Sequence, residues 1–391
     1  MFRRAIAVLL IACASATALA NSPTLTPKQI EQLQTLLPGV QVTPQLANQM
    51  AEVFYNREMP VRDRVAAIGK LVGIDQMPDR TPLRRTVCIW DIAGRSGPVY
   101  QAAMEQRALA LEYGIDIKLE PYTSEDVMVD EFQAGRCDAA LMSGLRARTF
   151  NAYTGTIDAV GAMPTDEHMH TLLQVLAHPS QAGHMVQGNY VVMGIFPAGG
   201  AYVFVNDREI SSLAKAAGRR VAVLDYDETQ AEMVAAIGAT PVRSSFVTAP
   251  NRFNNGQIDV LPAPLVAYEI LELYRGMSPN GGIVDYPLAQ LSMQLIGRID
   301  SFPNEIAQLI REASLEAYPD IMLRLEQENR RVPDRWWIPI PEQDKLEYEA
   351  MMDEARQALL ERDYYHADML TLQRRIRCRM DASRAECSRD R

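Results

Sequence analysis

Several sequence patterns of enzymes and membrane proteins are missing from this chain. No stretch after residue 20 is long and apolar enough to span a bilayer, so we expect no direct membrane span. The chain has no Gly-x-Ser-x-Gly motif, no P-loop, and no Gly-x-Gly-x-x-Gly after residues 221–224. The sequence therefore supports no particular reaction, and we expect neither an enzyme nor a cofactor.

Histidine and positive charge are both scarce. Only five of the 391 residues are histidines. Two of them, His168 and His170, are two residues apart, which on a helix points them to different faces, and no His-Glu-x-x-His spacing occurs. The sequence therefore favours no metal site, although His178 and His184 lie nearby. The net charge of -10 argues against nucleic acid or an anionic membrane surface as a partner.

The N-terminus predicts export. Residues 1–20 read as a signal peptide, with two arginines, an apolar run, and a small-x-small cleavage site at residues 18–20. Residues 10–13 also fit a lipobox, which would instead anchor the protein through Cys13. Under either alternative we expect the protein to reach the periplasm.

Four cysteines follow Cys13. An even number of cysteines in an oxidising compartment favours two disulfides. The Cys-x-x-Cys spacing that would indicate a metal site does not occur. Cys378 and Cys387 lie close together near the C-terminus, where a disulfide would staple the tail. Cys88 and Cys137 fall in two strands that would be neighbours in a parallel sheet, so they could also pair.

A short pattern occurs twice, in residues 132–142 and 253–263. In both, a helix ends at a Gly-x-x-Asp step and a short apolar strand follows. Each copy closes a strand–helix–strand unit, and we expect Asp138 and Asp259 to be structural, capping the turn before each strand. Two such units predict an α/β fold with two lobes and a cleft between them, which is the type II periplasmic-binding-protein-like architecture.

The expected elements divide the chain into five parts. They are a signal peptide (1–20), an N-terminal helical segment (21–80), lobe 1 (83–200, completed by 291–330), lobe 2 (203–290), and a C-terminal helical tail with a disulfide (331–391). Two crossings between the lobes, near residues 201–206 and 292–298, predict a hinge.

The order of elements from residue 86 to about residue 318 resembles the solute receptors of TRAP-type transporters, the DctP-like family. Six phrases carry this resemblance: residues 90–94, 133–138, 213–221, 237–242, the second Gly-x-x-Asp strand, and residues 302–306. The whole chain is also similar to a group of Gram-negative solute-binding proteins, some of which are described as RND-type efflux components linked to aminoglycoside resistance. That similarity is carried by residues 88–92, 143–148 and 336–341 and by the two tail cysteines. Both resemblances imply a receptor that delivers a solute to membrane transporter subunits.

One position departs from the TRAP pattern. TRAP receptors place an arginine that clamps the ligand carboxylate at the end of the strand corresponding to residues 221–223. Here that position is Ala222. A carboxylate ligand is therefore not implied by the resemblance and depends on other residues.

Ligands of open α/β sheets bind beyond the carboxyl ends of the strands, near helix N-termini. This rule selects Asp91, Arg95, Ser96, Ser143, Arg146 and Arg148 in lobe 1, and Asp225, Tyr226, Asp227 and Pro262 in lobe 2. The arginines favour a carboxylate or phosphate, and the aspartates favour an amine. A zwitterion or an amino sugar would use both sets.

The sequence therefore predicts a protein that captures a small polar solute between two lobes for a membrane transporter. The alternative is an envelope scaffold or adaptor associated with an efflux system, whose cleft binds nothing. Polar residues that converge from both lobes on one cavity would distinguish the first from the second.

Overall fold

The computed structural model describes residues 24–37, 39–73, 83–112, 115–212 and 214–388. The expected signal peptide and Cys13 lie outside these described residues. Within the described ranges, no helix has the length and apolar character needed to cross a membrane.

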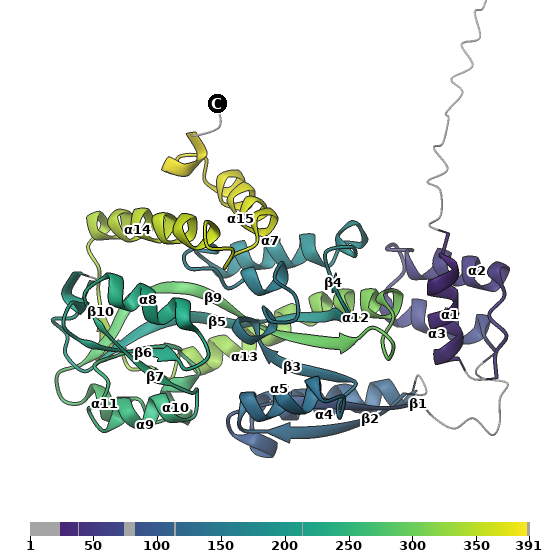
Figure 1. Cartoon of the computed structure of the whole chain (residues 1–391), viewed down its shortest axis with the longest axis horizontal. Helices are drawn as coiled ribbons and strands as arrows, with labels where there is room; N and C mark the ends of the chain where they lie inside the picture. The colour runs from purple at the N-terminus through teal and green to yellow at the C-terminus, as the bar shows by residue number, and fades with distance from the viewer. Residues whose placement is uncertain (1–23, 38, 74–82, 113–114, 213, 389–391) are drawn as a thin grey trace, which may run out of the picture.

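One mixed β-sheet runs through the molecule in the order β2-β1-β3-β9-β5-β8-β6-β7 (Figure 1). The strands are β1 (Leu83–Trp90), β2 (Ile115–Tyr122), β3 (Ala139–Ser143), β5 (Tyr190–Val205), β6 (Arg220–Leu224), β7 (Thr240–Ser244), β8 (Val260–Pro264) and β9 (Gly282–Arg298). β1 pairs in parallel with β2 and β3, and β6 pairs in parallel with β7 and β8. A parallel unit therefore lies at each end of the sheet.

The long antiparallel strands β5 and β9 join the two ends. β3 pairs with residues 293–297 of β9, and β8 pairs with residues 201–205 of β5. The ladder between β5 and β9 shifts register between Val192 and Gly194, Pro197 and Gly199, and Ala201 and Val203. The predicted two-lobed α/β architecture is confirmed, and β5 and β9 are the two connections between the lobes.

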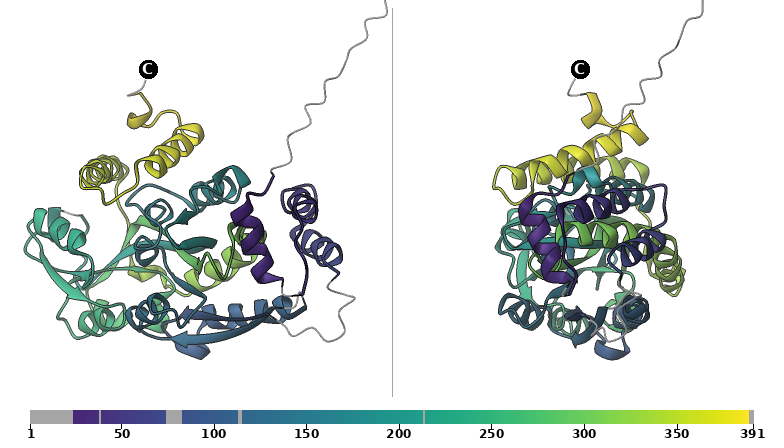
Figure 2. Two further views of the ribbon diagram at one scale, coloured as in Figure 1. Left: turned by 45° about the vertical axis from the view of Figure 1, so that its right-hand side comes forward. Right: turned by 90° about the vertical axis from the view of Figure 1, so that its right-hand side faces the viewer.

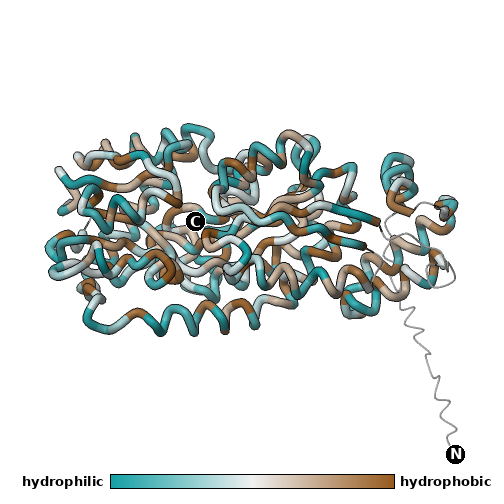
Figure 3. The backbone as a smooth tube through the Cα atoms, turned by 90° about the horizontal axis from the view of Figure 1, so that it is seen from below, coloured by the Kyte–Doolittle hydropathy of each residue, from teal (hydrophilic) through white to brown (hydrophobic). Residues whose placement is uncertain are grey.

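Helices and a separate hydrophobic core belong to each lobe. The helices α4 (Pro98–Glu112) and α5 (Glu125–Gln133) pack on β1 to β3, and α8 (Glu228–Ala236) and α9 (Thr248–Asn254) pack on β6 to β8. Phe132 and Phe150 are buried in one core, and Phe204 and Phe253 in the other. Hydrophobic and hydrophilic residues are interspersed along the backbone throughout the molecule (Figure 3).

The Asp of each repeated Gly-x-x-Asp step is structural, as predicted, but its carboxylate binds the neighbouring strand instead of capping its own turn. Gly135 and Gly256 have φ angles of 79° and 69°, which glycine adopts without strain. The Asp138 carboxylate accepts the N–H of Thr86 at 2.8 Å, which ties the turn before β3 to β1. The Asp259 carboxylate accepts the N–H of Arg220 at 2.8 Å and does the same between β8 and β6.

Both expected disulfides are present in the structure. Cys88 and Cys137 are buried and join β1 to the start of the β3 segment, as neighbouring parallel strands allow. Cys378 and Cys387 close a short loop at the end of the tail. The sequence pattern of four cysteines after Cys13 is thereby accounted for.

Three helices precede the sheet: α1 (Pro27–Leu36), α2 (Pro44–Phe54) and α3 (Val61–Leu71). Thr26 and Thr43 cap α1 and α2, each followed by proline at the first helical position. Their shared core closes on Leu309 of α12 (Asn304–Glu316). A buried ion pair, 2.5 Å between Arg64 and Glu312, fixes this attachment. The left view of Figure 2 shows the three helices grouped together at one side of the molecule.

The tail begins after α13 (Tyr318–Asn329) and contains α14 (Glu342–Leu360) and α15 (Ala367–Met380). Trp336 is buried and its Nε1 donates to the Tyr268 hydroxyl at 2.9 Å, while Trp337 lies in β10 (Trp337–Ile338), paired with β9. The two tryptophans thus pack against the body of the protein. In Figure 1, α14 lies over α8, and α15 lies beside α7 (Asp166–Leu176).

Candidate ligand-binding site

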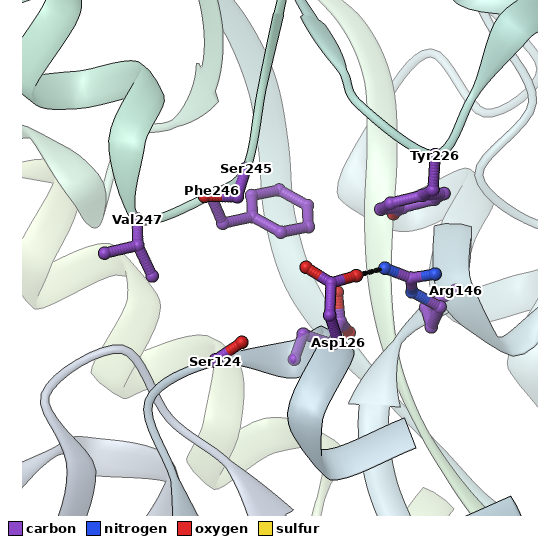
Figure 4. A pocket seen from close by; sticks show the side chains of 8 residues that line it. Ser124, Asp126, Arg146, Tyr226, Ser245, Phe246 and Val247 are labelled. Atoms are coloured by element: carbon purple, nitrogen blue, oxygen red, sulfur yellow. Dashed lines mark hydrogen bonds and ion pairs between the residues drawn. The ribbon is translucent and has the colours of Figure 1, made fainter. Parts of the chain in front are cut away.

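A pocket between the lobes is lined by residues from both of them (Figure 4). Its lining residues are Ser124, Glu125, Asp126, Arg146, Tyr226, Ser245, Phe246 and Val247. The cavity measures about 10 Å³, which is room for about one water molecule. The ring of Trp90 at the end of β1 lies 5.0 Å from the ring of Phe246 and closes one side. The lobes are therefore closed on one another, and a solute could enter only when they separate.

Strand ends and helix caps position the lobe 1 side of the pocket. Ser124 follows β2 and caps α5, which places Glu125 and Asp126 in the first helical turn. Ser143 ends β3 and caps the short helix α6 (Gly144–Ala147) by accepting the N–H of Arg146 at 3.2 Å. The N–H of Ser143 donates to Glu125 Oε1 at 2.7 Å, so the two strand ends are tied together.

Arg146 makes contact with both lobes. Its guanidinium pairs with Asp126 in lobe 1 and lies 3.4 Å from the ring centroid of Tyr226 in lobe 2. The side chain of Arg146 is only 12% exposed. A desolvated cation over an aromatic face is a favourable arrangement, and a planar guanidinium can also bind a carboxylate in two-point fashion.

Arg148 forms a second charged contact across the cleft. Its Nη1 lies 4.0 Å from Asp227 Oδ2 in lobe 2, and its guanidinium lies 3.7 Å from the ring centroid of Tyr364 in the tail. Asp227 also caps α8 by accepting the N–H of Gln230 at 3.1 Å. One cation and one anion therefore face each other between the lobes, with a tail tyrosine against both.

A buried carboxyl, Asp158, lies behind Arg148. It accepts hydrogen bonds from the N–H and the hydroxyl of Ser292 on β9, at 3.1 and 2.6 Å. Gly144 lies so close that an added Cβ would collide with both Asp158 and Ser292. Glycine is therefore required at this position by close packing.

The two buried carboxyl groups of the site resist ionisation. Burial raises the pKa of Glu125 to about 7, although hydrogen bonds from Ser143 and the charge of Arg146 oppose the change. Burial likewise raises the pKa of Asp158 to about 7 against hydrogen bonds from Ser292. Burial also raises the pKa of the Tyr226 hydroxyl, which stays protonated. The two carboxyl groups therefore carry less negative charge near pH 7 than ordinary carboxylates would.

Five buried polar atoms in this region have no hydrogen-bond partner among the described residues. They are Trp90 Nε1, Glu125 Oε2, Arg146 Nε, Arg148 Nη2 and Tyr226 OH. Buried polar atoms are normally paired, so these unpaired groups are available to water or to a bound molecule. The three nitrogen atoms are all N–H donors, and donors of this kind suit the oxygen atoms of an acid or a sugar.

The structure brings together half of the residues selected from the sequence. Ser143, Arg146, Arg148, Tyr226 and Asp227 lie at or beside the contact between the lobes. The others do not line the pocket: Arg95, Ser96, Asp225 and Pro262 are exposed.

Asp91 is buried, but its contacts are those of a helix cap. Its carboxylate accepts the N–H groups of Ala93, Val99 and Tyr100 at 2.8 to 3.0 Å. Gly97 leaves no room for a Cβ beside it. These contacts account for the carboxylate without a ligand.

Sequence reasoning missed several residues of the site. Glu125 and Asp126 follow the end of β2, so the strand-end rule could have selected them. Asp158 and Tyr364 carry no such signal, because one lies in an irregular segment and the other in a distant tail.

The clustered histidines do not converge. His170 stacks on Tyr318 and His184 stacks on Tyr153. Within the described parts of the chain, no group of three or more His, Cys, Asp or Glu side chains is placed to hold a metal ion.

Known solute-binding proteins match this chain in both sequence and fold. The solved structure of a TRAP periplasmic solute binding protein from Desulfovibrio salexigens, with bound orotic acid, has a TM-score of 0.65 at 16% identity, covering 76% of this chain and 99% of that one. One from Shewanella oneidensis, with bound succinate, has a TM-score of 0.62 at 13% identity, covering 75% and 99%. At these identities the match establishes the shared fold.

Sequence similarity is closer to a second group. "Probable solute-binding protein AdeT1" of Acinetobacter baumannii is 37% identical over 303 residues, which cover 77% of this chain and 99% of that protein. The family described as "Solute-binding protein AdeT 1/2" matches residues 72–391. The resemblance to TRAP receptors is thus confirmed for the fold, that to the solute-binding group is confirmed by sequence, and the chain belongs to the AdeT 1/2 family of solute-binding proteins.

Proposed function

We propose that this protein captures a small solute bearing a carboxylate in the cleft between its lobes, in the periplasm, and presents it to a membrane transporter. The observation that carries the proposal is the convergence of unpartnered polar atoms from both lobes: Trp90 Nε1, Arg146 Nε and Arg148 Nη2 from lobe 1, and Tyr226 OH from lobe 2. A solute that contacts both lobes favours the closed state, as a receptor of this type requires.

The charges of the cleft favour an acid over an amine. Arg146 and Arg148 are largely desolvated, and the carboxyl groups of Glu125 and Asp158 have pKa values of about 7. The two arginines therefore face little negative charge from these two buried carboxyl groups, which leaves their N–H donors available to an acid. A solute carboxylate would replace Asp126 as the partner of Arg146, or Asp227 as the partner of Arg148.

The fold relatives support the same class of solute. The Desulfovibrio salexigens receptor holds orotic acid and the Shewanella oneidensis receptor holds succinate. Because this chain has Ala222 where TRAP receptors place their clamping arginine, we assign the clamp to Arg146 and Arg148 instead. The family match also supports solute binding over the scaffold alternative.

A thermal-shift screen tests the proposal. The exported protein is screened against C4-dicarboxylates, sugar acids, amino acids, polyamines and aminoglycosides. A solute at a hundred times its Kd adds about 2.7 kcal/mol to the free energy of unfolding. A hit among the acids is the expected result. A hit confined to polyamines or aminoglycosides would contradict the carboxylate assignment.

Arg146→Ala is then compared with Arg136→Ala. We expect Arg146→Ala to weaken binding of the acid by at least about tenfold, because a charge-assisted contact is lost. Stability should change by only about 1 kcal/mol, since the partner Asp126 is 46% exposed. Arg136 forms an exposed pair with Glu131 outside the pocket, so its removal should leave affinity unchanged. Equal affinities for both variants would remove Arg146 from the site.

A further inference from the structure

The C-terminal tail is attached to both lobes. On lobe 2, Arg362 pairs with Glu232 of α8, and the Tyr348 hydroxyl donates to the carbonyl of Ser211 at 3.0 Å. The side chain of Met233, also on α8, packs against the apolar cluster of the tail. These contacts hold the tail to the second parallel unit.

On the lobe 1 side, the tail binds the segment 154–163 mainly through its backbone. Arg356 donates to the carbonyl of Val160 at 2.9 Å, and Arg377 donates to that of Ala162 at 2.6 Å. Gln373 donates to two further carbonyls of this segment, at 3.1 and 2.9 Å. This segment is joined to β9 through the hydrogen bonds between Asp158 and Ser292.

The tail is internally braced. Arg377 and Glu386 form a buried, two-point ion pair with both contacts between 2.6 and 2.7 Å. Burial opposes ionisation of Glu386, but hydrogen bonds and charge from Arg377 hold its pKa at about 2. The Cys378–Cys387 disulfide closes the same loop. A braced element that contacts two lobes restrains their relative movement.

Tyr364 lies where this restraint meets the solute site. Its hydroxyl donates to Asp227 of lobe 2, and its ring lies against the Arg148 guanidinium of lobe 1. Burial raises the pKa of Tyr364, so the hydroxyl keeps its proton and remains a donor. The neighbouring Tyr365 differs, since its oxygen accepts the N–H of Val160 on the lobe 1 side.

We propose that Tyr364 is a positioning residue of the solute site, through which the tail holds Arg148 in place and ties the two lobes in the closed arrangement. Its role at the site rests on the proposed function. The tie between the lobes is independent of the proposed function, because it is made entirely by residues of this chain. Separation of the lobes requires either the hydrogen bond between Tyr364 and Asp227 or the contact between Tyr364 and Arg148 to break.

The tie is tested without any solute by measuring the distance between the lobes. Spin labels are placed at Gln106 on α4 and at Asn255 after α9, both exposed, through cysteine substitutions in the exported protein. Double electron–electron resonance then gives the distance distribution. Tyr364→Phe keeps the ring but removes the donor, and Tyr365→Phe is the matched control. Asp227→Asn removes the charge of the acceptor while keeping a residue that caps helices well.

We expect Tyr364→Phe and Asp227→Asn each to add or enlarge a population at longer distance, and Tyr365→Phe to match the wild type. Identical distributions for Tyr364→Phe and the wild type would overturn the proposal. So would an equal change in Tyr365→Phe, which would indicate a general loosening of the tail. Because these distances are measured without a solute, a thermal-shift screen that finds no ligand does not change their interpretation.

If the screen identifies an acid, its affinity provides the second readout. We expect Tyr364→Phe to weaken binding by about tenfold, because the solute must then supply the closure that the lost hydrogen bond supplied. Unchanged affinity would overturn the role of Tyr364 at the site even where the distance between the lobes changes.

Discussion

The buried carboxyl of Glu125 makes the stability of the fold depend on pH in a definite direction. Its pKa in the folded protein is about 7, against an ordinary value of 4.5, a difference that corresponds to about 3 kcal/mol. Because folding favours the protonated form, this stabilisation is fully present below pH 4.5 and is lost as the pH rises through 7. Asp158 acts in the same direction, from 3.8 to about 7.

Glu125→Gln removes one of these two titrations while keeping the shape of the side chain. Its carbonyl can still accept the N–H of Ser143. Between pH 4.5 and 8, we expect the free energy of unfolding of the variant to rise relative to the wild type by up to about 3 kcal/mol. For a chain of this size this corresponds to a relative gain in Tm on the order of 4 °C. Differential scanning fluorimetry across this range measures it.

The control is Glu52→Gln, which changes an exposed glutamate on α2. Its Tm should follow the wild type at every pH. If Glu125→Gln also follows the wild type across the range, then the carboxyl is not desolvated as described, and the physical account of the pocket is wrong.

Three further predictions concern stability. Reduction of the Cys88–Cys137 disulfide should destabilise the fold by about 4 kcal/mol, because it releases a loop of 49 residues; a Tm unchanged by reductant, with thiols shown to be free, would contradict this. Arg64→Met should cost about 3 to 5 kcal/mol by leaving Glu312 buried without its cation, and a second change of Glu312 to Leu should recover much of the loss in denaturant unfolding. Gly144→Ala should prevent folding or lower Tm sharply, because the added methyl group has no space beside two buried polar side chains; a Tm within a degree of the wild type would refute the packing.

Much of the α/β order could be predicted because each unit depends on local signals. The apolar strands expected after the two Gly-x-x-Asp steps are β3 and β8. The long strands were predicted only in part, as residues 201–206 of β5 and 292–298 of β9. Pro197 and two glycines interrupt β5, and Pro287 interrupts β9, so the full length of each strand could not be predicted from the sequence. Their extent is set by pairing with each other.

The site was predictable where it depends on strand ends. Arg146 and Tyr226 follow β3 and β6, and the rule for open α/β sheets selects both. The same rule also selected Arg95 and Pro262, which are exposed, because it gives the edge of the sheet and not the direction of a side chain. The part played by Tyr364 depends on how a distant tail packs, which no local pattern encodes.

The pairing of β3 with β9 has a consequence for how the chain folds during its synthesis. Ala139 pairs with Gly297, so the lobe 1 end of the sheet cannot be completed until the whole of the second lobe has been synthesised. The N-terminal helices can complete their core only later, because that core includes Leu309. The strands β6 to β8 pair over short sequence distances and can form earlier, as local contacts generally do. A chain stalled before residue 293 would expose the unpaired edge of β3, which is a template for aggregation.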